Sequence, residues 1–86
     1  MNRNGRMEIA VYPIGTADTD FSEDIARVLA IVEQAHVPFE VTTMGTIIEG
    51  TADDLFVLAR RMHESAFSDR VGRVITIIKF DDRRTP

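Results

Sequence analysis

The side chains best suited to hold a ligand lie in the segment Thr43-Met44-Gly45-Thr46 and at Glu49, three positions further on. Threonine hydroxyls both donate and accept hydrogen bonds, and a glycine without a side chain lets a ligand approach the backbone. The carboxylate of Glu49 could accept hydrogen bonds from a ligand or face a cationic one. Structural roles are the alternatives: Gly45 supplies the backbone angles of a bulge, the threonines favour a strand, and Glu49 caps the next helix or is solvated.

Tyr12 and two histidines are further candidates. The ring of Tyr12 could stack on a heteroaromatic ring or a cation, although packing at an interface is the favoured interpretation. His36 follows a helix end and His63 lies within a helix, and neither has a serine or a second acid at a catalytic spacing. Structural roles are therefore expected for both. Because the sequence also has no cysteine, phosphate loop or nucleophile elbow, we expect neither a catalytic residue nor a cofactor.

The C-terminal segment Asp81-Asp82-Arg83-Arg84 pairs two acids with two bases. Two adjacent aspartates could hold a divalent metal, but no histidine or third carboxylate stands at a useful spacing, so no metal site is expected. Ion pairing within the segment, with Lys79 or with a neighbouring subunit is the better prediction. Exposed pairs of this kind contribute less than about 1 kcal/mol each, so they orient more than they stabilise.

Composition places the chain among small globular proteins. It has 86 residues, a net charge of −4, 44% hydrophobic and 28% charged residues, and no cysteine. We expect a disordered lead-in over residues 1–6 and a single domain over residues 7–86. The acidity argues against nucleic acid, and the absence of a long apolar run or a signal peptide predicts no membrane partner. The lack of cysteine fits a reducing cytoplasm, which is the expected location.

Alternating apolar residues predict strands over residues 7–14, 39–43, 46–49 and 71–80, with residues 39–49 forming a strand pair or a bulged hairpin. The first helix is expected to begin near Asp20, with Glu23 completing a cap, and the second at Thr51, with Asp54 in the same role. Each helix carries one apolar stripe. The stripes consist of Phe21, Ile25, Val28, Leu29 and Val32, and of Leu55, Leu58, Met62 and Ala66.

This order of elements predicts an α+β protein with a ferredoxin-like βαββαβ sandwich, an antiparallel sheet in the order 4-1-3-2 and two helices on one face. The strand over residues 71–80 is apolar on both sides, with Val74, Thr76, Ile78 and Phe80 on one side and Ile75 and Ile77 on the other. Two helices cover one face only, so the other face is expected to meet a second copy of the chain.

The predicted fold also places the polar segments. We expect the two central strands to run parallel, which would bring residues 12–15 and 48–50 to one end of the sheet. Residues 79–84 would then lie at the other end, near residues 43–45. We therefore expect two separate polar clusters, one at each end of the sheet.

Three segments together resemble the thiamine-binding protein family (YkoF-like domains). They are residues 11–16, Val-Tyr-Pro-Ile-Gly-Thr; residues 43–50, Thr-Met-Gly-Thr-Ile-Ile-Glu-Gly; and residues 78–84, Ile-Lys-Phe-Asp-Asp-Arg-Arg. The middle segment is the most specific, and the resemblance covers nearly the whole chain. It implies a ferredoxin-like fold, sheet-to-sheet dimers that pair into tetramers, and, in some members, a pocket for thiamine or a related pyrimidine.

The resemblance implies a non-enzymatic binding protein that holds thiamine or its pyrimidine moiety as a homo-oligomer, with Glu49 accepting from an aminopyrimidine or facing a thiazolium. The implied ligand-binding residues are Tyr12, Thr43, Met44, Gly45, Thr46 and Glu49. Where the family has tandem copies, this sequence has one, so pairing must be between chains. Two alternatives stay open: a small isomerase- or lyase-like enzyme with Glu49 as acid or base, and a structural oligomer without a ligand.

Overall fold

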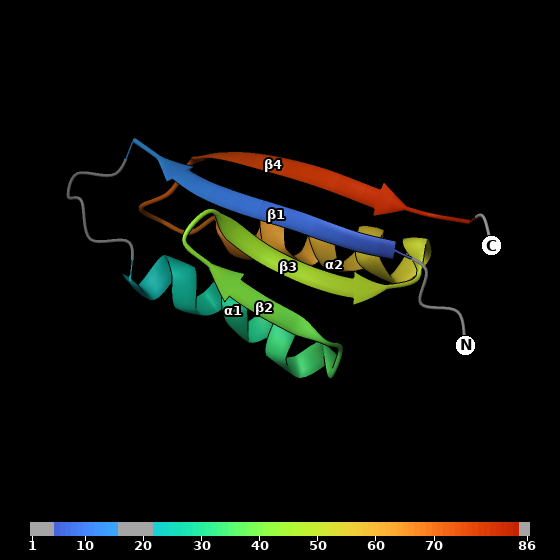
Figure 1. The fold of residues 1–86 in the computed structure, drawn as a ribbon. Coiled ribbons are helices and arrows are strands. Elements are labelled where there is room, and N and C mark those ends of the chain that lie inside the picture. Colours follow the sequence, from blue (N-terminus) through green and yellow to red (C-terminus); the bar gives the residue numbers. More distant parts are fainter. Residues whose placement is uncertain (1–4, 16–21, 85–86) are drawn as a thin grey trace.

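The computed structural model describes residues 5–15 and 22–84, which form a four-stranded sheet and two helices (Figure 1). In chain order the elements are β1 (Gly5–Ile14), α1 (Ser22–Ala35), β2 (Phe39–Thr42), β3 (Gly45–Gly50), α2 (Ala52–Ser65) and β4 (Arg73–Asp82). This order confirms the predicted βαββαβ arrangement. The first strand begins two residues ahead of the expected boundary, the last is shifted by two, and the expected cap residue Asp20 and stripe residue Phe21 lie outside the described residues.

The sheet has the order β2-β3-β1-β4 with every neighbouring pair antiparallel, which confirms the predicted order 4-1-3-2. The expected parallel direction of the two central strands is wrong. Each helix links two parallel strands, β1 with β2 and β3 with β4, so the central strands come from different units and run in opposite directions. Gly50 therefore pairs with Gly5, and Asp82 pairs with Gly5 from the other side. Both expected polar clusters are therefore wrong: residues 48–50 lie near residues 79–82, and residues 12–13 lie near residues 43–45.

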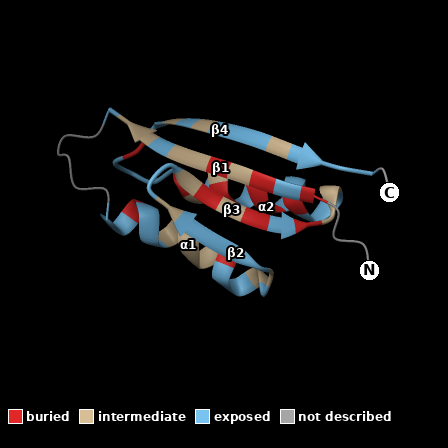
Figure 2. Ribbon diagram, in the orientation of Figure 1, coloured by how far each residue is buried: buried red, intermediate tan, exposed pale blue. Residues whose placement is uncertain are grey.

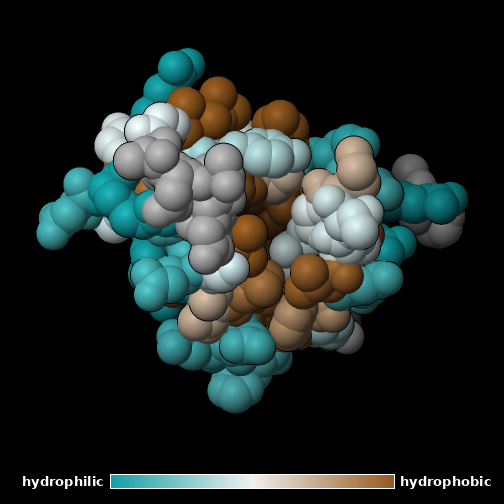
Figure 3. Space-filling view, turned by 90° about the vertical axis from the view of Figure 1, so that its left-hand side faces the viewer, coloured by the Kyte–Doolittle hydropathy of each residue, from teal (hydrophilic) through white to brown (hydrophobic). Residues whose placement is uncertain are grey.

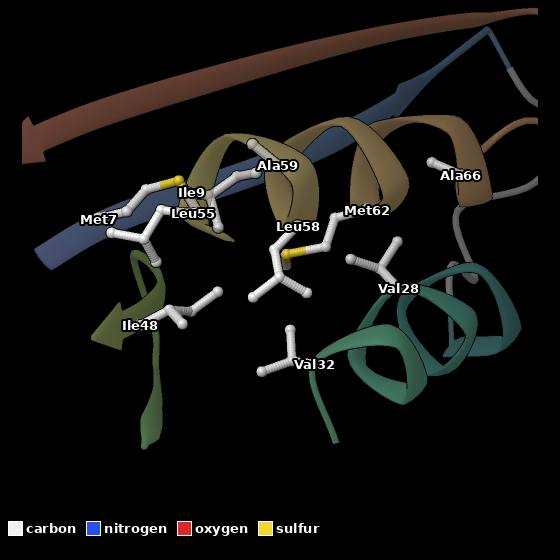
Figure 4. Close-up of a cluster of buried hydrophobic side chains, with 10 residues drawn as sticks. All are labelled: Met7, Ile9, Val28, Val32, Ile48, Leu55, Leu58, Ala59, Met62 and Ala66. Carbon is white, nitrogen blue, oxygen red and sulfur yellow. The ribbon is translucent and has the colours of Figure 1, made fainter. Parts of the chain in front are cut away.

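Both helices lie on one face of the sheet, α1 beneath β2 and β3 and α2 behind the central strands (Figure 1). The core fills the layer between sheet and helices, where red marks buried residues in Figure 2. Figure 4 shows its side chains converging from all three sides: Met7 and Ile9 from β1, Ile48 from β3, Val28 and Val32 from α1, and Leu55, Leu58, Ala59, Met62 and Ala66 from α2 and its end. Burial of this apolar surface, about 25 cal/mol per Å², is the main force that holds the layers together.

The second helix begins as its sequence predicts. The Thr51 side chain accepts a hydrogen bond from the Asp54 backbone amide at 3.2 Å, which satisfies one of the free amides of the first turn. All four members of its predicted stripe are buried. The stripe of α1 is confirmed only in part, because Val28 and Val32 are buried whereas Ile25 is half exposed.

The face of the sheet that carries no helix, here called the open face, has two halves of different character. In one half Tyr12 lies opposite Ile75, and Ala10 lies opposite Ile77. In the other half the partners are charged: Glu8 faces Lys79, and Arg6 lies between Glu49 and Asp81. The apolar half, at the end of the sheet where β1 finishes, exposes Tyr12, Ile75 and Ile77 to 45%, 41% and 57%.

Candidate functional site

A cavity of about 180 Å³ lies at the end of the molecule where β1 finishes and the β2–β3 hairpin turns. Figure 3 looks onto this end and shows a hollow with brown, apolar side chains along its walls. The walls come from three elements that are distant in sequence. Ile9 and Val11 of β1, Val28 and Leu29 of α1, and the hairpin residues 41–46 contribute to them. The fold thus brings the end of β1, the first half of α1 and the β2–β3 hairpin together around one apolar space.

The hairpin wall is held by the Thr42 side chain and by the close approach of Gly45 to β1. Thr42 Oγ1 accepts a hydrogen bond from the Met44 amide at 3.1 Å and donates one to the Gly45 carbonyl at 2.8 Å, which closes a two-residue turn. Gly45 has φ +154°, and a Cβ atom there would stand 2.8 Å from the Ile9 carbonyl oxygen. The glycine is therefore required by the close approach of β1, which supports its structural interpretation.

The two predicted threonines play different parts in the cavity. Thr46 is buried at 6% exposure on the helix side of β3, and its hydroxyl has no hydrogen bond to any residue that the structure describes. Since no fully buried side-chain oxygen among the described residues lacks a partner, this hydroxyl is accessible to solvent, and it lines the largely apolar cavity. Thr43 and Met44 form the turn at the rim, where Met44 is 71% exposed. Met44 can move without disturbing the core, because its side chain packs little.

Tyr12 also lines the cavity. Its place in the strand register puts its side chain on the open face, opposite Ile75. The ring is 45% exposed. Tyr12 thus lines the cavity, while its ring belongs to the apolar half of the open face.

Glu49 does not lie with the other five predicted residues. It pairs with Arg6, is exposed, and stands on the open face toward the end of the sheet that holds Gly50 and Asp82. The cavity is at the opposite end because β1 and β3 are antiparallel. The structure therefore brings together Tyr12 and the Thr43–Thr46 segment and separates Glu49 from them.

Asp24 is the cavity residue that the sequence reasoning missed. It is 1% exposed, and its two carboxylate oxygens accept hydrogen bonds from Arg27 Nη2 and Arg70 Nη2, each at 2.9 Å. Arg27 also donates through Nε to the Ser65 carbonyl at 3.0 Å, which ties the two helices together. A buried carboxylate needs such partners, because an unpaired charge in the interior is very costly.

A sequence signal for Asp24 did exist. Asp24, Val28 and Val32 are the buried residues of α1, and they stand four positions apart on one helical face. An acid in register with an apolar stripe faces the core, whereas its neighbour Glu23 is exposed. Only the partner arginine Arg70, far along the chain, could not be read from this pattern.

The other polar candidates lie away from the cavity. His63 Nδ1 is 2.7 Å from the Thr76 hydroxyl, and its ring meets Phe67 edge-on, so it packs α2 against β4. Arg84 pairs with Asp82 at 2.7 Å, and the hydrogen bonds from this guanidinium lower the pKa of the Asp82 carboxyl. Lys79, by contrast, pairs with Glu8 across the strands. Among residues 5–15 and 22–84, no group of three or more potential ligands could hold a metal ion.

None of the described helices is long and apolar enough to cross a membrane.

Comparison with known proteins gives relatives in bacteria and archaea. The chain is 36% identical over 81 residues to the UPF0045 protein YqgV of Bacillus subtilis, covering 90% of this chain and 78% of that protein. It is 33% identical to a UPF0045 protein of Methanothermobacter thermautotrophicus, with 90% and 79% covered.

Solved structures share the fold. A domain of unknown function from Bacillus cereus superposes with a TM-score of 0.82 at 28% identity, covering 92% of this chain and 75% of that one. A Thermotoga maritima protein proposed to act in thiamine biosynthesis or salvage superposes with a TM-score of 0.79 at 18% identity, covering 92% and 83%. The model of the thiamine-binding protein family matches residues 7–86, and the chain belongs to that family.

Proposed function

We propose that the cavity binds thiamine through its aminopyrimidine ring and that the protein is a non-enzymatic carrier or sensor of this ligand. The observation that carries the proposal is the hydroxyl of Thr46, which has no hydrogen bond to a described residue and borders a largely apolar space that also borders Asp24. Ligand sites typically combine apolar walls with a few fixed polar groups. Membership of the thiamine-binding family supports this choice of ligand.

The size of the cavity suits one ring. Its volume of about 180 Å³ slightly exceeds an apolar cavity of about 150 Å³ that holds benzene, and it is smaller than the roughly 300–1,000 Å³ typical of drug-sized ligands. A substituted pyrimidine would fill it. The thiazolium half of thiamine would then lie at the mouth, beside Met44 and the Tyr12 ring.

The polar groups around the cavity suit a thiamine molecule whose pyrimidine ring lies inside and whose thiazolium ring lies outside. Each Asp24 oxygen accepts one arginine hydrogen bond and keeps a further lone pair, so the carboxylate can accept from the exocyclic amino group of an aminopyrimidine. The Thr46 hydroxyl can donate to a ring nitrogen or accept from the amino group. At the mouth, the face of Tyr12 can contact the thiazolium cation, an interaction of about 0.5–2 kcal/mol.

Self-association belongs to the same proposal. The apolar half of the open face, formed by Ala10, Tyr12, Ile75 and Ile77, is a surface that small domains normally cover. A second copy stacked on it would bury these side chains and place its own Tyr12 near the cavity mouth. We further propose that the oligomer acts in the cytoplasm, as the cysteine-free sequence indicates.

An enzymatic role has weaker support. The acid or base expected for it was Glu49, which lies on the open face far along the strand from the cavity. The carboxylate that does border the cavity, Asp24, has both of its oxygens engaged by arginine guanidinium groups. Binding is the function that this arrangement favours.

Isothermal calorimetry with thiamine, thiamine monophosphate and the free aminopyrimidine tests the proposal. We expect heat with thiamine and with the aminopyrimidine, and an affinity about five- to tenfold lower in Thr46→Val, which keeps the shape and removes one hydrogen bond. Glu49→Ala is the matched control and should bind as the wild type does. Absence of heat with all three compounds would overturn the function, and loss of binding in Glu49→Ala would move the site to the open face.

A further inference from the structure

Asp24 is the one charged side chain among the described residues that line the cavity. It is 1% exposed and shares the buried face of α1 with Val28, one turn further along the helix. The other polar side chains of the lining are hydroxyls, which both donate and accept hydrogen bonds, whereas a carboxylate only accepts. They belong to Tyr12, Thr42, Thr43 and Thr46. Asp24 is therefore the polar side chain of the cavity whose hydrogen-bonding character is fixed.

Two arginines hold this carboxylate from outside the cavity. Arg27 Nη2 donates to Oδ1 and Arg70 Nη2 donates to Oδ2, each at 2.9 Å, and neither arginine is among the described residues of the lining. Arg27 is anchored in turn, because its Nε donates to the Ser65 carbonyl at 3.0 Å. Arg70 lies between Ser68 and Val71, whose backbones exchange hydrogen bonds at 3.1 and 3.2 Å. Both arms of the carboxylate are thus fixed in direction.

The carboxylate keeps accepting positions for a ligand. Its two oxygens offer about four such positions, and each oxygen accepts one of the arginine hydrogen bonds. A ligand that donates a hydrogen bond at this point meets an acceptor that is already oriented, so little further ordering is needed. A ligand that presents an acceptor there leaves two acceptors facing each other in a buried position, which is costly.

We propose that Asp24 determines the specificity of the cavity, selecting an aminopyrimidine against the corresponding oxopyrimidine, and that Arg27 and Arg70 are the positioning residues that hold it. The proposal rests on the proposed function, since it requires the pyrimidine ring to enter the cavity. The exocyclic amino group donates hydrogen bonds, and the ring nitrogen beside it accepts. In the oxo compound this pattern is reversed, because a carbonyl oxygen accepts and the neighbouring ring N–H donates.

The threonines of the cavity do not make this distinction. The Thr46 hydroxyl can rotate to donate or to accept, so it serves either ring. The Thr42 hydroxyl is already occupied, because it donates to the Gly45 carbonyl and accepts from the Met44 amide. Discrimination between the amino and the oxo group is therefore assigned to Asp24.

Calorimetry of the unmodified chain with thiamine and with oxythiamine, in which a carbonyl oxygen replaces the amino group, tests the selection directly. We expect thiamine to bind at least about a hundredfold more tightly, because the oxo compound leaves buried polar groups unpaired. This comparison does not depend on the stability of any variant. Affinities within about threefold of each other would overturn the selection and leave the proposed function in place. Absence of heat from both compounds would instead remove the function itself.

Asp24→Asn tests whether this residue is the one that selects. A carboxamide offers a donor as well as an acceptor, so the ratio of the two affinities should fall at least about tenfold. Thr46→Val is the matched comparison: it should weaken both compounds by a similar factor and leave their ratio unchanged. Circular dichroism establishes that each variant is folded. A folded Asp24→Asn chain with the wild-type ratio would overturn the assignment.

Variants of Arg70 test the positioning role without changing the carboxylate. Arg70→Met removes the donor to Oδ2 and should lower the affinity ratio about tenfold, because the carboxylate is then free to turn. Arg70→Lys keeps a donor and should restore part of the ratio. Arg60→Met, at an exposed position of α2, is the control and should bind both compounds as the wild type does. A loss of stability in Arg70→Met with an unchanged ratio would show that Arg70 serves the fold alone.

Discussion

Asp24 and Arg70 stand 46 positions apart and are joined by a 2.9 Å hydrogen bond between Oδ2 and Nη2. The other carboxylate oxygen holds Arg27, which in turn binds the Ser65 and Ala66 carbonyls at the end of α2. One buried acid thus connects the start of α1, the end of α2 and the segment that leads into β4. It also borders the cavity, so the stability of the fold and the shape of the site depend on the same group.

We expect Asp24→Asn to lower the free energy of unfolding by about 2–3 kcal/mol, because two charge-assisted hydrogen bonds are weakened in a buried position. The loss is less than that of a fully buried pair, since both arginines are about two-fifths exposed and can turn to water. Urea denaturation measures it. Glu23→Gln, on the exposed side of the same turn, should change stability by less than about 0.5 kcal/mol. Equal effects at the two positions would contradict the connecting role of Asp24.

Gly45→Ala should destabilise the protein by about 2 kcal/mol or more, because the new Cβ would stand 2.8 Å from the Ile9 carbonyl oxygen at φ +154°. Gly72→Ala is the natural comparison, since nothing lies within 4 Å of its Cβ position. Thermal unfolding followed by circular dichroism would show the difference. A tolerant Gly45 would mean that the hairpin can move away from β1.

Thr51→Ala should cost about 1 kcal/mol through loss of the cap on α2. Thr51→Ser keeps the accepting oxygen and should restore most of that stability. Denaturant titration of the three chains gives the comparison. An alanine variant as stable as the serine variant would show that packing alone holds the helix start.

Asp82 should titrate below the usual aspartate range, because hydrogen bonds from Arg84 favour the ionised carboxylate and lower its pKa. Since the folded pKa is depressed, the pair's contribution to stability is present above the unfolded pKa of about 3.9 and is lost as the pH falls through the folded value. NMR titration of the side-chain carboxyl carbon measures this. Arg84→Gln should return the midpoint to the ordinary range, and an unchanged midpoint would remove Arg84 as the cause.

Local patterns predicted most of the elements correctly. The alternation of Met7, Ile9 and Val11, the stripe through Leu55, Leu58 and Met62, and the cap at Thr51 are all found where the sequence places them. These features depend on side-chain periodicity and capping hydrogen bonds between residues a few positions apart, so a short segment of sequence is enough to predict them.

What the sequence by itself determined is therefore the set of elements, their order and the cluster from Thr43 to Thr46. Only the tertiary structure decided the direction of β3 against β1, which places Glu49 at the end of the sheet away from the cavity. It also decided that Asp24 would be buried against Arg70. Strand pairing and buried ion pairs join residues that are far apart in sequence, and their geometry depends on how the helices and the sheet pack together rather than on any local pattern.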